Sequence, residues 1–195
     1  MVSREKIIDE AFRESLSRGY QCADVISIGR RAGVTKGDLY YQFKSKSHLA
    51  LAVLDHIESK TGCPVDADLS CELPFVFRSL VWKPQSTGVQ SWAEIAAVLT
   101  GFSNEVRRSC KSVHARIESI VEAVLDKLTL AILQERMNKP NGLTISADEL
   151  SLLVGSAVLG CVALSQICRH RSFIEQVQLT LDRLAHCELA IEPVH

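Results

Sequence analysis

The sequence predicts an all-α fold in two parts, a three-helix domain over residues 1–46 and a larger helical domain over residues 47–195. Apolar residues recur at helical spacing through most of the chain. Valine and isoleucine nowhere alternate with polar residues for long enough to suggest a strand. Capping residues and glycine breaks divide the first 60 residues into short helices.

The first three predicted helices have clear start or stop signals. Gly19 ends the first helix in the manner of a C-terminal glycine. Asp24 can cap a second helix, and Gly33 ends it at a turn where a positive φ is favourable only for glycine. Thr35 can cap a third helix over residues 36–43.

The fourth helix, residues 47–60, begins after the Ser45 cap and links the small domain to the larger one. The helical pattern then lapses around Pro64, which cannot continue a helix interior. Ser146 opens a capping box of the form S-x-x-E. The helices predicted in the larger domain cover residues 69–81, 90–105, 107–137, 146–169 and 172–187.

Charge is distributed unevenly along a chain whose formal net charge is −1. Residues 1–46 hold nine Lys or Arg and six Asp or Glu, a balance of +3, so the remainder carries −4. A basic small domain on an acidic body indicates an anionic partner for the small domain. Charged runs more often simply solvate a surface, and the balance alone leaves both interpretations open.

The seven cysteines are odd in number and include no C-x-x-C pair, which predicts free thiols in a reducing cytoplasm and no zinc site. Charged residues interrupt any apolar run at the N-terminus, so we expect no signal peptide. The most apolar stretch, 150–168, contains serines and glycines, and a buried helix is expected there in place of a membrane span. No cofactor or metal is expected.

Residues 32–46, AGVTKGDLYYQFKSK, place two tyrosines and a phenylalanine among three lysines directly after a glycine turn. Two short helices joined by such a turn predict a helix-turn-helix unit. The second helix of this unit enters the major groove of DNA. Leu39, Tyr40 and Phe43 are expected to lie on one side of it and to anchor it in the three-helix core.

Several side chains elsewhere on this helix suit contact with DNA. Lys36 can reach guanine or phosphate, and Gln42 can make a bidentate contact to adenine. Gly37 lets the backbone come close to a base or phosphate. Lys46 follows the Ser45 cap and puts a cation at a helix N-terminus, a natural phosphate site. For each residue taken singly, a solvated helix surface is the commoner case.

Four segments, IIxxAF (7–12), RGY (18–20), IGxxAGVTKGxLYYxF (28–43) and SKxxL (45–49), resemble the N-terminal domain of the TetR family of transcriptional regulators. The run from residue 32 to residue 49 is the specific part. Position 29, commonly alanine in the family, is glycine here. Where the family often has Thr or Ser near the start of the second helix, this chain has Ala23-Asp24. An aspartate there repels phosphate unless it serves as the helix cap.

The resemblance implies contacts to DNA from one set of residues: Thr35, Lys36, Gly37, Tyr40, Tyr41, Gln42 and Lys46. It places Tyr40 and Tyr41 close to backbone phosphates, with Tyr40 also structural, and has Lys46 hold a phosphate. A cytoplasmic regulator of transcription, most commonly a repressor, is the function that it implies. The implied partner is a double-stranded DNA operator, with no membrane.

The resemblance also implies a homodimer in which the last two long helices, 146–169 and 172–187, form a four-helix interface. A small-molecule effector of unknown identity would bind in the body and release the operator. The expected pocket lining is Phe75, Phe77, Trp82, Trp92, Leu99, Phe102, Ile117 and Val121. For each of these side chains, plain core packing is the alternative.

Three other functions compete with a ligand-responsive repressor. A redox or electrophile sensor of the same fold would use Cys110, which lies among Arg107, Arg108 and Lys111, because a reactive thiol needs a lowered pKa and exposure; a buried inert thiol is the alternative. An enzyme is not expected, since the chain has no glycine-rich phosphate loop, nucleophile elbow or metal-spaced histidines. A helical module without DNA binding is favoured only by Asp24.

Overall fold

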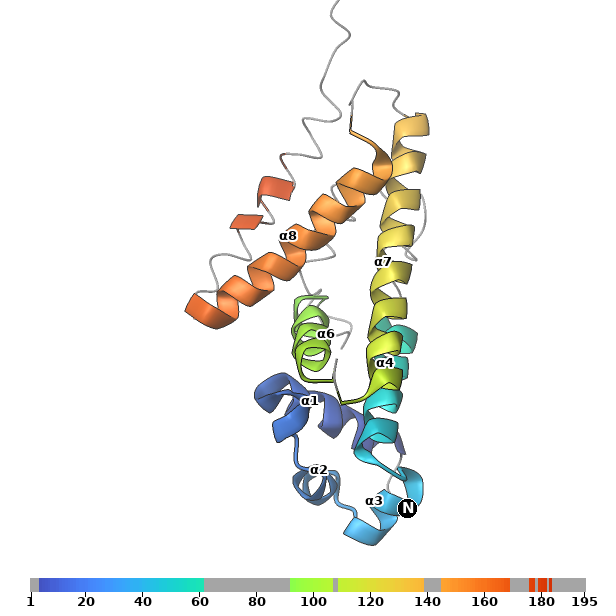
Figure 1. The fold of residues 1–195 in the computed structure, drawn as a ribbon, viewed down its shortest axis with the longest axis vertical. Helices are drawn as coiled ribbons and strands as arrows, with labels where there is room; N and C mark the ends of the chain where they lie inside the picture. The colour runs from blue at the N-terminus through green and yellow to red at the C-terminus, as the bar shows by residue number, and fades with distance from the viewer. Residues whose placement is uncertain are drawn as a thin grey trace, which may run out of the picture. The chain divides into compact units, whose positions relative to one another are not determined.

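The computed structural model describes residues 4–61, 92–106, 109–138 and 145–168, and near the C-terminus residues 176–177, 179–181 and 183. All regular secondary structure in these ranges is helical, which confirms the predicted fold class (Figure 1). The predicted helix 69–81 lies outside the described residues, and the predicted helix 172–187 is described only in part. The helices are α1 (Arg4–Cys22), α2 (Val25–Ala32), α3 (Lys36–Gln42), α4 (Lys46–Thr61), α6 (Trp92–Val106), α7 (Lys111–Asn138) and α8 (Ala147–Cys168).

Helix α1 contains a break at the glycine that the sequence predicts to end it. Gly19 has φ 76° and ψ 173°, outside the helical region, and the helix resumes as far as Cys22. Before the break, α1 buries the apolar face that its sequence periodicity predicts, including Ile7 and Phe12. The predicted end at Gly19 is therefore a kink, after which a short further segment presents its backbone to neighbouring helices.

Local capping determines where α2 and α3 begin and end. The Asp24 carboxylate accepts hydrogen bonds from the backbone N–H groups of Ile26 and Ser27, at 3.0 and 3.1 Å. Gly33, with φ 78°, closes α2 in the left-handed conformation. Thr35 and Asp38 form a reciprocal capping box at the start of α3. The predicted caps Asp24, Gly33 and Thr35 are confirmed.

The helix-turn-helix core is built on an i, i+4 pair of α3 and its C-cap. Leu39 is 1% exposed and Phe43 is fully buried. A Cβ at Gly29 of α2 would lie 3.2 Å from the Leu39 Cδ1, so the glycine allows α2 and α3 to approach closely. Tyr40 is 44% exposed, and its predicted place in this core is wrong. One residue beyond Leu39, its side chain is turned by roughly 100° around the helix.

An ion cluster joins α1 to α2. The Glu14 side chain on α1 is fully buried, and its carboxylate pairs with the guanidinium of Arg31 on α2. Arg18, one turn along α1, lies 3.5 Å from the other carboxylate oxygen. A buried carboxylate is tolerated only where such partners replace its lost hydration. This cluster therefore helps to set the angle at which α2 supports α3.

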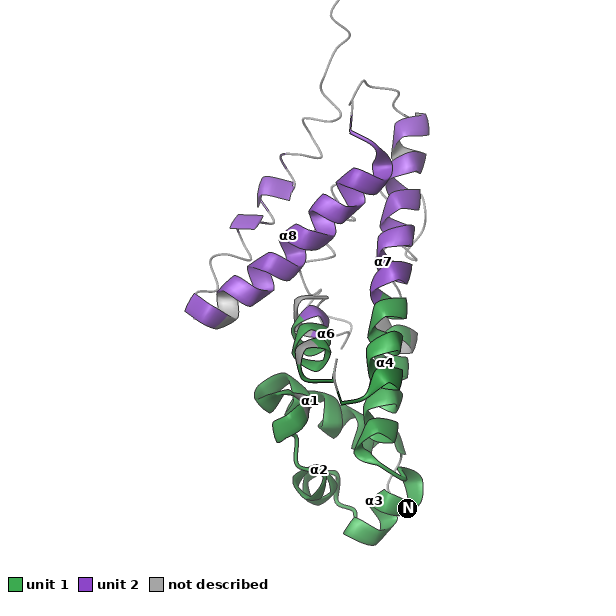
Figure 2. Cartoon of the chain, in the orientation of Figure 1, with its two compact units in different colours: residues 1–60, 97–120 green, residues 61–96, 121–195 purple. Residues whose placement is uncertain are grey.

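The chain divides into two compact units (Figure 2). The first comprises residues 1–60 and 97–120, and the second comprises residues 61–96 and 121–195, so the division falls within α6 and α7. The first unit thus includes α4, the linking helix that the sequence pattern groups with the larger domain. Arg116 of α7 holds α4 in this unit, through Asp55 at 2.9 Å and through Glu58.

In the second unit, α8 packs against the C-terminal half of α7. Thr129 Oγ1 donates a hydrogen bond to Ser151 Oγ at 2.9 Å. A Cβ at Gly155 would come within 2.9 Å of the Leu125 Cδ2, so this glycine permits close helix approach. Several apolar side chains of α8 are nevertheless exposed: Leu152, Leu153, Leu159, Leu164 and Ile167.

One described helix is long and apolar enough, by length and composition, to cross a membrane. It is the Ala147–Leu164 stretch of α8, with a mean hydropathy of 1.7 and 39% of its residues buried. Core helices of soluble proteins meet the same criterion. The sequence predicts a buried helix in this stretch, and the burial that the structure shows is partial.

Candidate nucleic-acid interface

Helix α3 presents a cationic and aromatic surface to solvent. Lys36 begins the helix and is exposed, and Tyr41 is 89% exposed. The Lys36 ammonium lies 5.9 Å from the centre of the Tyr40 ring, within reach of a cation–π contact. Together these groups can contact a phosphate backbone and base edges.

Thr35 is engaged in forming the helix. Its hydroxyl donates to the Asp38 carboxylate at 2.6 Å and accepts from the Asp38 N–H at 3.2 Å. The hydrogen bonds from Thr35 lower the pKa of Asp38, which keeps the carboxylate charged. The Thr35 hydroxyl consequently stabilises α3 in the absence of DNA, and any DNA contact from it has to share this hydrogen bond.

Gly37 and Gln42 stand in contrasting surroundings. A Cβ at Gly37 would meet only the Thr35 hydroxyl oxygen, at 3.7 Å, so this position is open for close approach of a ligand. Gln42 is half-buried, and its Oε1 atom finds no hydrogen-bond partner among the described residues. Because this amide oxygen is buried, the predicted contact from Gln42 to adenine requires the side chain to move into solvent.

The Lys46 side chain, for which the sequence predicts a phosphate contact, is bonded to the backbone of the first unit. Its Nζ donates a hydrogen bond to the backbone carbonyl oxygen of Gln21, at 2.8 Å. Burial lowers the pKa of Lys46, while attraction from Glu105, Cys22 and Asp24 acts in the opposite direction. The predicted phosphate contact from Lys46 therefore requires its side chain to leave this position.

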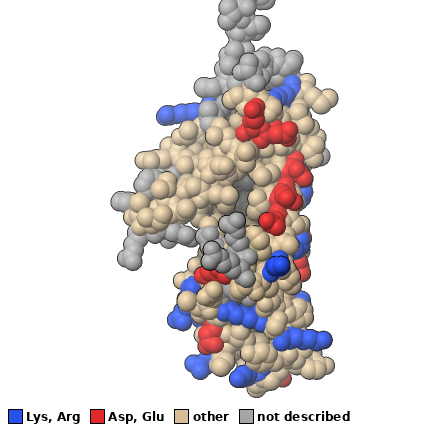
Figure 3. Space-filling model, viewed as in Figure 1, with Lys and Arg blue, Asp and Glu red and all other residues tan. Residues whose placement is uncertain are grey.

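Three basic residues that the sequence pattern does not single out surround Phe43, the C-cap of α3. The Arg4 guanidinium lies 5.0 Å from the centre of the Phe43 ring, and the His48 ring meets Phe43 edge-on at 5.9 Å between centres. Exposed Lys44 adjoins them, and its backbone N–H donates a hydrogen bond to the Nδ1 of His48, with 3.4 Å between the two nitrogens. Figure 3 shows Lys and Arg side chains gathered over the N-terminal helices on the face in view. In the sequence, Arg4 is marked only as one of the basic residues of the positively charged segment 1–46.

Although Asp24 caps α2, its side chain is exposed, so its negative charge can still act on a bound phosphate, and replacing it by asparagine is expected to strengthen binding to DNA. Asparagine ranks with aspartate as a helix cap, and its single side-chain oxygen can keep one of the two capping hydrogen bonds while the negative charge is removed. Removing a repulsion of about 1 kcal/mol between charges in water corresponds to roughly fivefold tighter binding at low salt. Titration of a labelled duplex followed by fluorescence anisotropy measures this change.

Asp126→Asn is the matched control, because it removes the same charge from an exposed position on α7. Equal effects of the two substitutions would show that only the net charge matters. Weaker binding by the Asp24 variant would contradict the assignment of Asp24 as a residue that opposes phosphate.

The residues predicted to line an effector pocket fall into different parts of the chain. Phe75, Phe77 and Trp82 lie outside the described residues, as does the side chain of Trp92 at the start of α6. Leu99, Phe102 and Ile117 are buried within the first unit, and half-buried Val121 belongs to the second. The predicted pocket stays a prediction for all eight residues.

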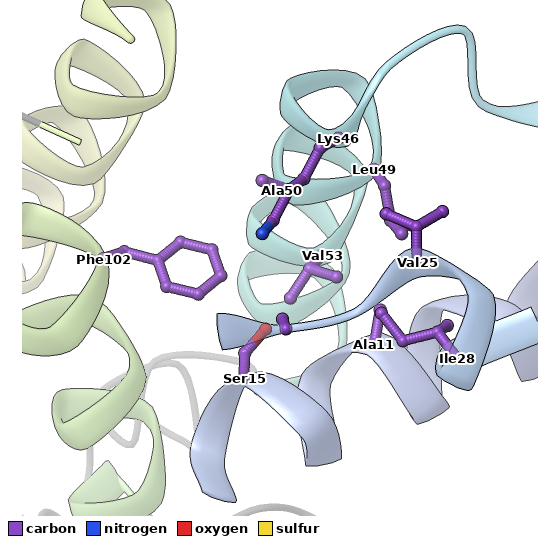
Figure 4. A pocket seen from close by; sticks show the side chains of 10 residues that line it. Ala11, Ser15, Val25, Ile28, Lys46, Leu49, Ala50, Val53 and Phe102 are labelled. Atoms are coloured by element: carbon purple, nitrogen blue, oxygen red, sulfur yellow. The ribbon is translucent and has the colours of Figure 1, made fainter. Parts of the chain in front are cut away.

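A cavity lies within the first unit, among α1, α2, α4 and α6. Its volume is about 20 Å³, and its lining includes Ser15, Lys46, Val53 and Phe102 (Figure 4). Small-molecule sites have volumes of roughly 300 Å³ or more, so this cavity is too small for an effector. Phe102 therefore packs here against the N-terminal helices. Within the described part of the chain, no group of three or more His, Cys, Asp or Glu side chains could hold a metal ion.

The N-terminal segment of this chain is similar to known regulatory proteins. Residues 7–53 match the family model for bacterial regulatory proteins of the tetR family. An uncharacterized HTH-type transcriptional regulator from Pseudomonas putida, TtgW, is 32% identical over 71 residues. The matched region is 36% of this chain and spans half the length of TtgW.

Solved structures extend the similarity of fold to nearly the whole chain. A TetR-family transcriptional regulator from Cytophaga hutchinsonii superposes with a TM-score of 0.79, covering 97% of this chain and 96% of that chain at 14% identity. FadR from Bacillus subtilis, in complex with stearoyl-CoA, gives a TM-score of 0.65, covering 99% of this chain and all of that chain at 15% identity. At these identities the similarity establishes the fold alone.

Proposed function

Because this chain belongs to the TetR family of transcriptional regulators, we propose that it is a homodimeric repressor that a small-molecule effector releases from a near-palindromic operator. The observation that carries the proposal is the surface of α3, where exposed Lys36 and Tyr41 stand on a helix anchored by buried Leu39 and Phe43. A rigid base under exposed polar groups is what sequence-specific contact requires.

The dimer is proposed through α8 and the chain that follows it. The exposed leucines of α8 give this helix an apolar surface that a second copy of the chain would cover. A two-fold dimer presents α3 twice, which suits an operator with two related half-sites. Analytical ultracentrifugation of the protein, with and without an operator duplex, tests this stoichiometry.

The effector is proposed to act by changing the populations of two states of the dimer. A ligand shifts such an equilibrium only when its affinity differs between the states. FadR, which has the same fold, was solved with a bound acyl-CoA, and this supports a small-molecule site in the helical body. A ligand screen that monitors release of DNA identifies the chemical class of the effector.

Fluorescence anisotropy on the DNA upstream of the protein's own gene tests the proposed function. Tight, dimer-sized binding is expected, with a log–log salt slope of about −0.9 per phosphate contact. Binding that is no tighter than binding to an unrelated duplex would send the search to a random-sequence selection. Failure to enrich any sequence there would overturn the proposal.

A second candidate, a thiol-based sensor of the same fold, is favoured by the surroundings of Cys110. This half-buried residue immediately precedes α7, where the N–H of His114 donates to its carbonyl oxygen. Its Sγ lies 3.4 Å from the Ser112 Oγ. Hydrogen bonds from Ser112 and from Ser47 of α4 lower the pKa of the Cys110 thiol. Modification of this sulfur would thus disturb a contact to α4.

Alkylation by iodoacetamide is expected to modify Cys110 at a lower pH than an ordinary thiol. The thiolate is the reacting form, so the lowered pKa shifts the rise in reaction rate to lower pH. Burial raises the pKa of Cys161, and that buried thiol should remain unmodified. Mass spectrometry of peptides alkylated across a pH series measures both rates.

The sensor hypothesis then depends on the effect of alkylation on DNA binding. Loss of operator affinity on alkylation, absent in Cys110→Ser, supports a thiol sensor. Unchanged affinity after complete alkylation of Cys110 would eliminate this candidate and leave the ligand-responsive repressor.

A further inference from the structure

The break in α1 presents one residue's backbone to two charged side chains. Beyond Gly19, the Gln21 N–H donates to the carboxylate of Glu105 on α6. The carbonyl oxygen of the same residue accepts the hydrogen bond from Lys46 Nζ, at 2.8 Å. Glu105 and Lys46 therefore contact opposite ends of one residue. We call this arrangement of Glu105, Gln21 and Lys46 the Glu105 latch.

The glycine at position 19 makes the latch possible in two ways. Its positive φ is a conformation that other residues rarely adopt. A Cβ at this position would lie 2.5 Å from the Glu105 Oε1, a distance that real Cβ contacts essentially never show. Any other residue at position 19 would thus obstruct the approach of the Glu105 carboxylate.

The Lys46 side chain is directed inward at this site. Figure 4 shows its nitrogen in the cavity, near Phe102 of α6 and Val53 of α4. Burial disfavours the ammonium there, and the negative charge of Glu105 offsets part of that cost. Lys46 is also the first residue of α4, at a helix N-terminus where a phosphate would be favoured.

We propose that Glu105 is a positioning residue that keeps the Lys46 ammonium retracted from the DNA-facing surface, so that α6 controls whether this cation is available to a phosphate. The proposal rests on the proposed DNA-binding function. In the latched state Lys46 is bonded to Gln21, and a phosphate has to compete with that bond and with the attraction of Glu105. A movement of Glu105 away from α1 releases the side chain.

Glu105→Gln tests the latch, because the amide oxygen can still accept from the Gln21 N–H while the negative charge is lost. Its effect on operator affinity is measured in the full-length protein, alone and combined with Lys46→Met. We expect roughly fivefold tighter binding at low salt, and a salt slope steeper by about 0.9 for each subunit of the dimer. In the double variant this gain disappears. Glu122→Gln, an equal charge change at an exposed position of α7, is the control.

A second readout needs no DNA. Reductive ¹³C-methylation of lysines followed by NMR titration reports the pKa of Lys46, which Lys46→Met identifies by loss of its signal. Because Glu105 stabilises the ammonium, Glu105→Gln should lower that pKa further, while Glu122→Gln leaves it unchanged.

The Lys46 pKa and the operator affinities of the variants together test the proposal. A lowered pKa with non-additive effects of Glu105→Gln and Lys46→Met on affinity supports it. An unchanged pKa, or additive effects on affinity, overturns it even if the wild-type protein binds its operator tightly. If neither the wild-type protein nor any variant binds a selected duplex, the proposed function fails, and the role of the latch in DNA binding fails with it. A shift in the Lys46 pKa would in that case still establish the interaction between Glu105 and Lys46.

Discussion

Replacing both Lys36 and Tyr41 by alanine is expected to reduce affinity for the proposed operator about 100-fold or more. A contact from Lys36 to a base edge contributes roughly 1–3 kcal/mol, Tyr41 adds a phosphate contact, and the proposed dimer makes each contact twice. Both side chains are exposed, and neither contributes to the buried base of α3, so the fold should be retained. Fluorescence anisotropy at a series of salt concentrations measures the loss. The slope should also become shallower by about 0.9 for every phosphate contact removed.

Thermal unfolding of the same variant separates loss of contact from loss of structure. The midpoint should match that of the wild-type protein within a few degrees, because surface substitutions away from structural features change stability by roughly 0.5 kcal/mol at most. Lys111→Ala, at an exposed position on α7, is the control for the loss of one positive charge. Retained specific binding by the double variant would show that α3 is not the surface that reads DNA.

Arg31→Ala destabilises the first unit by about 2–3 kcal/mol, somewhat below the 3–5 kcal/mol typical when a fully buried pair loses one partner. The substitution leaves the fully buried Glu14 carboxylate with Arg18 at 3.5 Å. The discount reflects the Arg31 side chain, which is 44% exposed and so still partly hydrated. Urea unfolding followed by circular dichroism measures the difference.

The neighbouring Arg30→Ala provides a matched control on the same helix. Arg30 is exposed, and its removal should change stability by less than about 0.5 kcal/mol. Glu14→Gln combined with Arg31→Ala should recover part of the loss, because the buried charge is then absent. Equal stability of the Arg30 and Arg31 variants would contradict the role of the buried ion cluster in holding α2 on α1.

The sequence by itself determined the features that depend on neighbours within a few residues. Asp24, Thr35 and Gly33 are recognisable as caps and breaks because each acts on backbone groups two to four positions away. The helix-turn-helix segment follows from the spacing of these signals. The all-α class follows from periodicity, which is likewise a local property. The hydrogen bonds of these caps join only nearby backbone groups, so a pattern of neighbouring residues is enough to predict them.

The sequence alone predicts less well which side chains of a helix are buried. The sequence groups Tyr40 with Leu39 and Phe43, but only Leu39 and Phe43 are buried, and the Tyr40 side chain is turned by roughly 100° around the helix from Leu39. The sequence predicts that the first helix ends at Gly19, where the structure has a kink. A glycine signal does not show whether the chain resumes helical geometry beyond it. That outcome depends on what packs beside the helix.

Only the tertiary structure decided the position of Lys46 and the pairing of Glu14. Gln21 and Glu105 are 84 residues apart in the chain, and Glu14 and Arg31 are 17 apart. No periodicity relates such positions, and the sequence around Lys46 points instead to a phosphate at a helix N-terminus. Which of two possible partners a long, flexible side chain contacts is decided by the helices that the fold brings beside it, since the free energies of such alternatives differ by only about 1 kcal/mol at a protein surface.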